Sequence, residues 1–293
     1  MKVIFIGGVR FSACALQELI AMQVNIVGVC TAAQSSVNSD HVNLSSIAEE
    51  SRIPVKLTTN INDVETLAWI SRFNPDIIFC FGWSQIIKQP LLSLPPMGIV
   101  GYHPAALPSN RGRHPLIWAL VLGLTETAST FFFMDEGADS GDILDQRTVA
   151  IQQSDDAESL YKRITEVAIS QIRDYVPRLT ARKNDRHPQD HQQANAWRKR
   201  GVTDGIIDWR MAAVSIHNLV RGLTRPYVGA HFVHQDNIFK VWRTEVVDSV
   251  PLNIEPGKIL AADSDGPLVK TGIGAIRLCE ISPKIDLCAG EYL

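Results

Sequence analysis

The sequence predicts an α/β fold, with a doubly wound, Rossmann-like parallel sheet domain followed by a small antiparallel β-barrel of the OB-like type. Two observations predict the first part. Short runs that are apolar throughout alternate along the first half of the chain with stretches of helical periodicity, and strands that are apolar on both faces belong in a sheet covered on both sides. A third observation predicts the second part, because short strand-like runs with Gly, Pro and Asp between them fill the C-terminal region.

The elements of the first half follow in regular order. The expected strands are VIFIG (3–7), NIVGVC (25–30), PVKL (54–57), DIIFCFG (76–82) and GIVGYH (98–103). The expected helices are FSACALQELIAM (11–22), SSIAEESRI (45–53), DVETLAWISRF (63–73) and one that starts at Ser84. Functional residues of such sheets cluster at the carboxyl ends of the strands, so the ends of 76–82 and 98–103 are expected to form one crevice.

A change in composition divides the chain. The 293 residues are more than one ordinary core holds, and the stretch 182–200 carries six Lys/Arg against two Asp with almost no large apolar residues. We therefore predict a first domain at 1–184, a linker at 185–203 and a second domain at 204–293. The second domain is expected to contain one helix and then the strand-like pieces GAHFVH, IFKVWRTEVV, GKILAAD, GPLVKTG and AIRLCEI.

Composition also excludes some classes of protein. With 45% hydrophobic and 20% charged residues the chain is typical of a globular protein, and a net charge of −3 gives no overall field that would attract a polyanion. Arg10 interrupts the first apolar run too early for a signal sequence, and no stretch is long enough to cross a bilayer. The five cysteines are odd in number and lack a C-x-x-C spacing, which indicates reduced thiols and a cytoplasmic protein.

Two common kinds of site are not favoured. The glycines at 7–8 lack the third glycine of a dinucleotide-binding turn, and no acidic residue ends the second strand. His187 and His191 lie in the polar stretch, which is typical of a linker, while His231 and His234 stand three apart on an expected strand and so point to opposite faces. We expect no metal site.

The residues favour a histidine–carboxylate pair instead. His103 ends an apolar strand and is followed by a proline-containing loop, whereas the glycine-rich loop MDEGADSGDIL (134–144) carries four carboxylates, Asp135, Glu136, Asp139 and Asp142. A carboxylate beside an imidazole fixes its tautomer and stabilises its cationic form, which suits acid/base chemistry. From the residues alone, a packed core histidine stays open as the alternative.

Three segments together resemble the formyltransferases that use 10-formyltetrahydrofolate. HPAALPSNRGRHPLIWAL (103–120) is similar to the family's His-x-x-Leu-Leu-Pro and Arg-Gly pattern, and MDEGADSGDIL is similar to its loop with the catalytic aspartate. IIDWRMAAVSIHNLVRGLTRPYVGAHF (206–232) resembles the start of the C-terminal domain of methionyl-tRNA formyltransferases and of related amino-sugar N-formyltransferases. The resemblance covers nearly the whole chain. It identifies 1–184 as the catalytic domain.

The resemblance implies that a formyl group is transferred from 10-formyltetrahydrofolate to an amine. His103 would manage the protons and Asp139 would orient it. The folate pocket would be lined by Phe81, Gly82, Trp83, Ser84, Gln85, Ile86, Asp135 and Gly137. Gly101 departs from the family, which usually has an asparagine two residues before the histidine to hold the developing oxyanion.

The acceptor amine is harder to infer. The segment 31–46 has no Lys or Arg, whereas initiator-tRNA enzymes carry a basic loop there, and the chain from Arg200 onward has ten Lys/Arg against eleven Asp/Glu. We therefore expect an amino sugar carried on a nucleotide, of the kind used in lipopolysaccharide or glycan synthesis, as the acceptor. The expected substrate-binding residues are Arg10, Asn110, Arg111 and Arg113.

Two alternatives stay open. One is a methionyl-tRNA formyltransferase, and the other is a folate-binding or hydrolytic relative that lacks the usual asparagine. The preferred interpretation implies small-molecule substrates, no nucleic-acid partner and no membrane partner, and it leaves a homodimer open.

Overall fold

The computed structural model describes residues 1–34, 39–183 and 185–293. These residues form two compact units. The first comprises 1–115, 127–149 and 162–197, and the second comprises 116–126, 150–161 and 198–293. The domain boundaries at 185–203 inferred from composition stay a prediction, which limited proteolysis can test.

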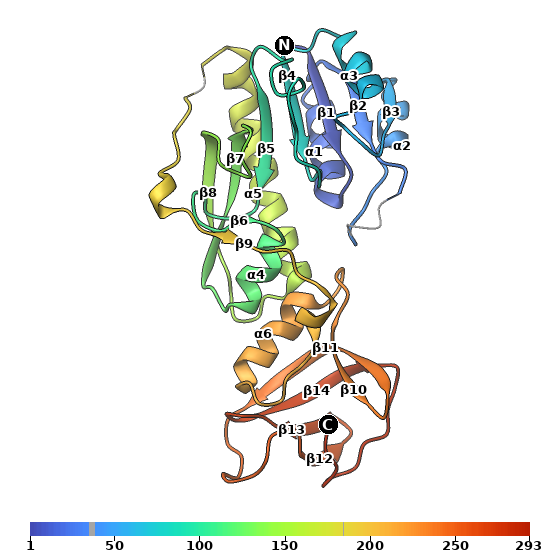
Figure 1. Ribbon diagram of the computed structural model, residues 1–293, viewed down its shortest axis with the longest axis vertical. Helices are drawn as coiled ribbons and strands as arrows, with labels where there is room; N and C mark the ends of the chain where they lie inside the picture. The colour runs from blue at the N-terminus through green and yellow to red at the C-terminus, as the bar shows by residue number, and fades with distance from the viewer. Residues whose placement is uncertain (35–38, 184) are drawn as a thin grey trace. The chain divides into compact units, whose positions relative to one another are not determined.

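The first unit is built on a seven-stranded sheet of order β3-β2-β1-β4-β5-β7-β8 (Figure 1). The strands are β1 (Val3–Gly7), β2 (Ile26–Thr31), β3 (Val55–Leu57), β4 (Ile77–Phe81), β5 (Ile99–His103), β7 (Glu126–Phe133) and β8 (Ile143–Ala150). The first five pair in parallel, as their apolar runs predict. The chain winds outward from β1 to β3 and then returns to β4 on the other side, so the carboxyl ends of β1 and β4 meet where ligands of such sheets bind.

Helices α1 (Arg10–Ala21), α2 (Ser45–Glu50) and α3 (Val64–Ser71) connect β1 to β4 in turn, and the long α5 (Ala157–Thr180) follows β8. In α1 the buried Phe11, Ala15, Leu16 and Leu19 recur at helical spacing, and this face packs against β1 and β4. The doubly wound α/β fold class is therefore confirmed.

Strand β7 runs antiparallel to β5, unlike the strands before it. The register pairs His103 with Thr130 and Gly101 with Phe132. Met134, just past β7, donates its backbone N–H to the Ile99 carbonyl at 2.7 Å. The apolar end of β7 thus lies along the strand that carries His103, and the loop with the carboxylates begins there.

The helix expected from Ser84 does not form, and residues 82–98, between β4 and β5, contain neither a helix nor a strand. The segment contains Pro90, Pro95 and Pro96, which lack a backbone N–H and disfavour helical continuation. A two-residue parallel pair also appears that the sequence does not predict, between β6 (Arg111–Gly112) and β9 (Ala196–Trp197).

The second unit contains a five-stranded antiparallel sheet of order β10-β11-β14-β13-β12. Its strands are β10 (Ala230–His234), β11 (Asn237–Val247), β12 (Ile259–Asp263), β13 (Gly266–Lys270) and β14 (Ala275–Ser282). The remaining helical elements of the chain are α4 (Pro115–Val121), α6 (Ala213–Leu223) and the 3₁₀ turns η1 (His191–Gln193) and η2 (Val202–Gly205). Ile216 of α6, Phe232 and Val241 share one buried core, and the predicted antiparallel strands are confirmed.

None of the helices in the described ranges combines the length and the apolar composition that a membrane span requires.

Candidate functional site

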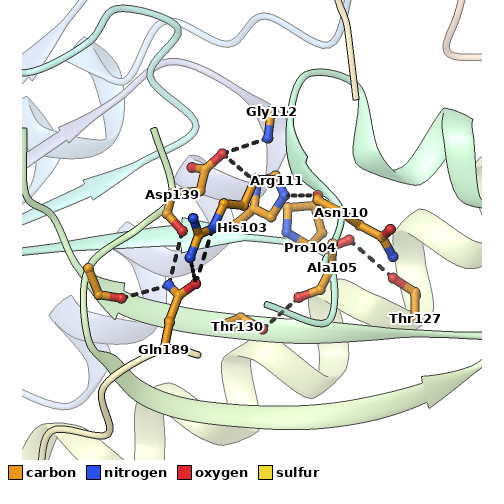
Figure 2. A network of polar contacts seen from close by, with 11 residues as sticks. His103, Pro104, Ala105, Asn110, Arg111, Gly112, Thr127, Thr130, Asp139 and Gln189 are labelled. Carbon is orange, nitrogen blue, oxygen red and sulfur yellow. Dashed lines mark hydrogen bonds and ion pairs between the residues drawn. The ribbon is translucent and has the colours of Figure 1, made fainter. Parts of the chain in front are cut away.

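His103 lies at the carboxyl end of β5, and only 5% of it is exposed. Its Nε2 is 2.8 Å from the backbone carbonyl oxygen of Asn110. Because a carbonyl oxygen can only accept, Nε2 carries the proton of this hydrogen bond. The imidazole is therefore fixed by its own downstream loop, and Nδ1 is the ring atom left to face other groups (Figure 2).

Asp139 faces that second nitrogen. Its Oδ2 lies 3.7 Å from Nδ1 of His103, which is the distance of an ion pair rather than of a direct hydrogen bond. The same oxygen accepts the backbone N–H of Gly112 at 2.9 Å. Asp139 has a φ of 55°, a left-handed conformation that costs a non-glycine residue about 1 kcal/mol or more, so its loop needs support from outside.

Gly112 joins this site to the two-residue pair β6–β9. Its φ is 100°, and a Cβ there would lie 2.3 Å from the Trp197 carbonyl oxygen. Only glycine fits in both respects. The glycine of the Arg-Gly pattern is therefore required by the local backbone. It lets residues 111–112 pair with 196–197 while the N–H of Gly112 donates to Asp139.

Gly101 stands two residues before His103 on the same strand, at the position where the resemblance implies an asparagine. A Cβ at this position would lie 3.0 Å from Cγ of Met134 and 3.0 Å from the ring atoms Cε1 and Cζ of Phe132. Those contacts are tighter than ordinary van der Waals separations. Two apolar side chains therefore occupy the space that an asparagine would need.

The loop after β4 contains five of the predicted folate-binding residues, Gly82 to Ile86, whereas Phe81 ends β4 and is fully buried. Gly82 has a φ of 68°, and the Nε1 of Trp83 is buried without a hydrogen-bond partner among the described residues. Ile86 is 61% exposed. Gln85 is committed to a neighbouring loop, because its Oε1 accepts the N–H of Ile61 at 3.0 Å and its Nε2 donates to the Thr59 carbonyl at 2.6 Å.

The fully buried Ser12, which the sequence analysis does not single out, anchors the β4 loop to the turn after β1. Its hydroxyl donates to the carbonyl of Phe81 at 2.6 Å and accepts the N–H groups of Gly8 and Val9 at 3.2 and 3.1 Å. A serine three residues into a helix after a glycine pair is its only sequence signal. Ser12 fixes the meeting point of the two strand ends.

Asp135 and Gly137 shape the loop that carries Asp139. Oδ1 of Asp135 accepts the N–H of Gly137 at 3.0 Å and the hydroxyl of Ser140 at 2.7 Å. These bonds lie within the loop. Asp135 thus stabilises the turn that presents Asp139.

The four predicted substrate-binding residues have different partners. Arg111 donates to Oε1 of Gln189 and lies 3.1 Å from Nδ1 of His191, whereas Arg113 donates to the Ser84 carbonyl at 2.9 Å and so joins the histidine loop to the β4 loop. Arg10 begins α1, and its N–H donates to the Asp40 carbonyl at 3.0 Å. Asn110 contacts His103 through its backbone.

Two further residues enter the site from the polar stretch that sequence reasoning treats as a linker. Gln189 is 6% exposed and bonds to the Asp139 loop, and Oδ1 of Asn195 accepts the N–H of Asn110 at 2.6 Å. No periodicity or motif marks them in the sequence. Within the described ranges, no group of three His, Cys, Asp or Glu side chains is arranged to hold a metal ion.

Comparison with known proteins identifies the family. The profile described as formyl transferase matches residues 1–175, and the formyl transferase C-terminal domain matches residues 201–289. The chain belongs to the formyl transferase family. It is therefore an enzyme of the formyltransferase class, as the sequence predicts.

Among its relatives, a protein of Geobacter metallireducens named methionyl-tRNA formyltransferase is 32% identical over 285 residues, which is 96% of this chain and 90% of the relative. The N-formyltransferase of Helicobacter canadensis, solved with folinic acid and dTDP-3-aminofucose, has a TM-score of 0.73 at 16% identity, covering 96% of this chain and 100% of that one. Methionyl-tRNA formyltransferase of Clostridium thermocellum has a TM-score of 0.61 at 19% identity, covering 84% and 93%. At such identities the two structures show the fold alone.

These findings contradict the predicted acceptor. Relatives that are 30 to 32% identical to this chain over nearly its whole length are named methionyl-tRNA formyltransferase, whereas the N-formyltransferase solved with dTDP-3-aminofucose is only 16% identical, so the prediction of an amino sugar on a nucleotide is wrong. The error has a physical reason. The prediction relies on the absence of Lys and Arg from the loop 31–46 and on the net charge of the second domain. Phosphate contacts require only a local group of exposed cations, which neither count detects. Residues 35–38 of that loop also lie outside the described part of the chain.

Proposed function

We propose that this chain transfers the formyl group of 10-formyltetrahydrofolate to the α-amino group of methionyl-tRNA. The observation that carries the proposal is the likeness over nearly the full length of both chains to proteins named methionyl-tRNA formyltransferase, at 30 and 32% identity. The matches to both family domains support it. The proposal replaces the expectation of an enzyme without a nucleic-acid partner.

His103 is the group that handles the proton. In the overall reaction the amine nitrogen bonds to the formyl carbon, the bond from that carbon to the folate nitrogen breaks, and one proton passes from the amine to the folate nitrogen. Since Nε2–H of His103 is donated to the Asn110 carbonyl, Nδ1 is the atom that takes up the proton. Asp139, 3.7 Å from Nδ1, stabilises the imidazolium that forms.

Two features of the β4 loop support folate binding. The indole N–H of Trp83 is buried and has no acceptor among the described residues, so it can donate to a bound ligand. The exposed Ile86 provides apolar surface in the same loop. We infer that Gly82, Trp83, Ser84, Gln85 and Ile86 hold the folate together with Asp135 and Gly137 of the loop after β7, whereas the predicted Phe81 is fully buried among Phe5, Phe79 and Phe131 and supports the loop from the core. When bound, the folate supplies the activated formyl group.

Exposed cations of the stretch 182–200 suit the phosphates of a tRNA. Arg182, Lys183 and Lys199 are exposed, and the stretch carries six Lys and Arg against two Asp. We propose that this stretch contacts the tRNA backbone. The KM for methionyl-tRNA should then rise steeply with salt, because each neutralised phosphate releases a counterion.

The test is direct. Purified chain, 10-formyltetrahydrofolate and charged initiator tRNA are mixed, and N-formylmethionine released from the tRNA is measured by mass spectrometry. We expect formylation by the wild type and a loss of at least about a hundredfold in His103→Ala, as is typical when positioned acid/base help is removed. His234→Ala, at the end of β10, is the matched control and should keep full activity.

Two results would overturn the proposal. One is that the wild type forms no formylmethionine but formylates a nucleotide-linked amino sugar that is supplied instead of the tRNA. The other is release of free formate without any formylated amine, which would reveal a hydrolase.

A further inference from the structure

Residues 186–197, named here the return segment, run back over the catalytic loops although they follow the last helix of the catalytic domain. His187 exchanges both backbone hydrogen bonds with Ile143 at 2.8 and 2.9 Å. Asn195 accepts the N–H of Asn110, and Ala196–Trp197 pair with β6. The stretch expected to be a linker is thus held against the loops on both sides of His103.

Gln189 is the buried centre of the return segment. Its Nε2 donates to the Gly141 carbonyl at 2.6 Å and to the Asp139 carbonyl at 3.0 Å (Figure 2). Its Oε1 accepts from Nη2 and Nε of Arg111 at 2.6 and 3.2 Å. The two donors and both acceptor positions of the amide are therefore all used, so the side chain has one fixed orientation.

The two loops that Gln189 joins carry the two partners of His103. Asp139, opposite Nδ1, lies in one loop, and Asn110, whose carbonyl accepts from Nε2, lies beside Arg111 in the other. Asp139 also has the left-handed backbone conformation that needs external support. A hydrogen bond to its own carbonyl oxygen supplies that support at the residue that needs it.

We propose that Gln189 is a positioning residue of the formyl transfer, which sets the Asp139 carboxylate against the His103 ring. This inference rests on the proposed function. Its consequence is that Gln189 acts on the chemical step through Asp139. A side chain that only satisfies buried polar groups would affect folding and leave the chemical step of the folded enzyme unchanged.

The experiment is a double-substitution cycle on the full chain with 10-formyltetrahydrofolate and methionyl-tRNA. Gln189→Met keeps the side-chain length and removes every hydrogen bond of the amide. We expect kcat to fall about 10- to 100-fold with the KM for folate within about twofold, because a small misplacement of a catalytic group slows chemistry more than it weakens binding. In an Asp139→Asn background the same change should cost less than about threefold, since the group it positions is already disabled.

Two companion variants keep the test informative. Gln189→Glu retains the volume and the acceptor for Arg111 but loses both donors and places a carboxylate against two carbonyls. Its ion pair with Arg111 keeps residue 189 attached to the histidine loop, and kcat should fall to a similar extent. Gln192→Met lies in the same segment, is exposed, and should match the wild type.

A second readout needs no substrate. The ¹⁵N chemical shift of His103 Nδ1 should move in Gln189→Met in the same direction as in Asp139→Asn, and should stay in place in Gln192→Met. The inference would be overturned if the double variant lost kcat by the product of the two single losses, because the two residues would then act independently. It would also be overturned if the Nδ1 signal did not move in a folded Gln189→Met protein. A wild type that forms no formylmethionine would contradict the proposed function instead, and the Nδ1 signal would still decide the role of Gln189.

Discussion

Both ring nitrogens of His103 face oxygen atoms of the protein, and this arrangement depends on two loops far apart in the sequence. The Asn110 carbonyl fixes the proton on Nε2, and the Asp139 carboxylate faces Nδ1. A histidine arranged in this way has a defined tautomer and a counter-ion for its cationic form, which are the two properties that acid/base catalysis requires.

The glycine at 101 yields a prediction at the residue scale. Gly101→Asn should destabilise the first unit by about 1–3 kcal/mol, because overpacking a filled site costs this much, and should lower kcat about tenfold. The crowding atoms belong to Met134 and Phe132, each 3.0 Å from the added Cβ. Urea unfolding and the formylation rate measure the two effects.

A second substitution separates crowding from lost chemistry. Gly101→Asn combined with Met134→Ala makes room for the amide and should recover part of the lost stability and rate. A higher kcat in Gly101→Asn alone would mean that the enzyme simply lacks an oxyanion donor and that the space is not filled.

Sequence reasoning finds residues whose neighbours in the chain reveal them. His103 is marked by its place at the end of an apolar strand, and Asp139 by a loop pattern. Gln189 is not, because its bond to Arg111 joins residues 78 positions apart and the polar segment around it has no periodicity. Long-range pairing of this kind is decided by tertiary structure alone.

At the scale of elements, Ser12 joins α1, the turn after β1 and the end of β4. Ser12→Ala should lower the free energy of unfolding of the first unit by about 1–3 kcal/mol, because it leaves the buried Phe81 carbonyl and two N–H groups without their partner. Chemical denaturation monitored by fluorescence is the measurement. Ser71→Ala on the exposed face of α3 is the control and should change stability by less than about 0.5 kcal/mol; an equal effect of both variants would refute the role of Ser12.

Helix α6 yields a pH prediction. Burial of His217, helped by the nearby Arg221, lowers the pKa of this histidine below its usual 6.5 in the folded chain. As the pH falls through about 6.5, the unfolded chain takes up a proton that the folded chain does not. The stability that the neutral His217 provides is thus fully present above that pH and is lost below it.

The check compares two proteins. The urea midpoint of the second unit should fall between pH 7.5 and 5, and the fall should be smaller in His217→Gln, which retains a partner for the Thr244 hydroxyl but does not titrate. Identical pH dependence in the two proteins would exclude His217 as a source of the effect.

Elements with a strong local pattern are predictable, and those that depend on partners are not. The apolar runs at 3–7, 76–82 and 98–103 correspond to β1, β4 and β5. The pair β6–β9 has two residues in each strand and is formed by a glycine conformation and by Gln189 and Asn195, so no periodicity reveals it. The helix expected at Ser84 was wrong because the prolines that follow outweigh a favourable start.

At the scale of the whole molecule, composition is a poor guide to the acceptor. A net charge of −3 is compatible with either a small substrate or a tRNA, since a few exposed cations suffice for phosphate contacts. The class of reaction follows from the loops around His103, whereas the acceptor depends on a surface that residue counts do not locate.

The division into two units yields the last prediction. Brief trypsin digestion of the native chain should cut first within 182–200, where exposed Lys and Arg lie in a polar stretch with few buried residues.

Cleavage before the return segment and cleavage after it have different consequences. A cut after Lys199 leaves a fragment, residues 1–199, that contains the return segment. A cut after Lys183 leaves the return segment on a different fragment from the loops that it contacts. We expect the 1–199 fragment to bind the stable analogue 5-formyltetrahydrofolate as tightly as the intact chain does, because Gly82–Ile86, Asp139 and Gln189 all remain in it. Mass spectrometry of the fragments and a binding titration are the measurements. A first cut inside 98–145 would show that the catalytic loops are less well held than their hydrogen bonds to the return segment imply, and that the predicted boundary is wrong.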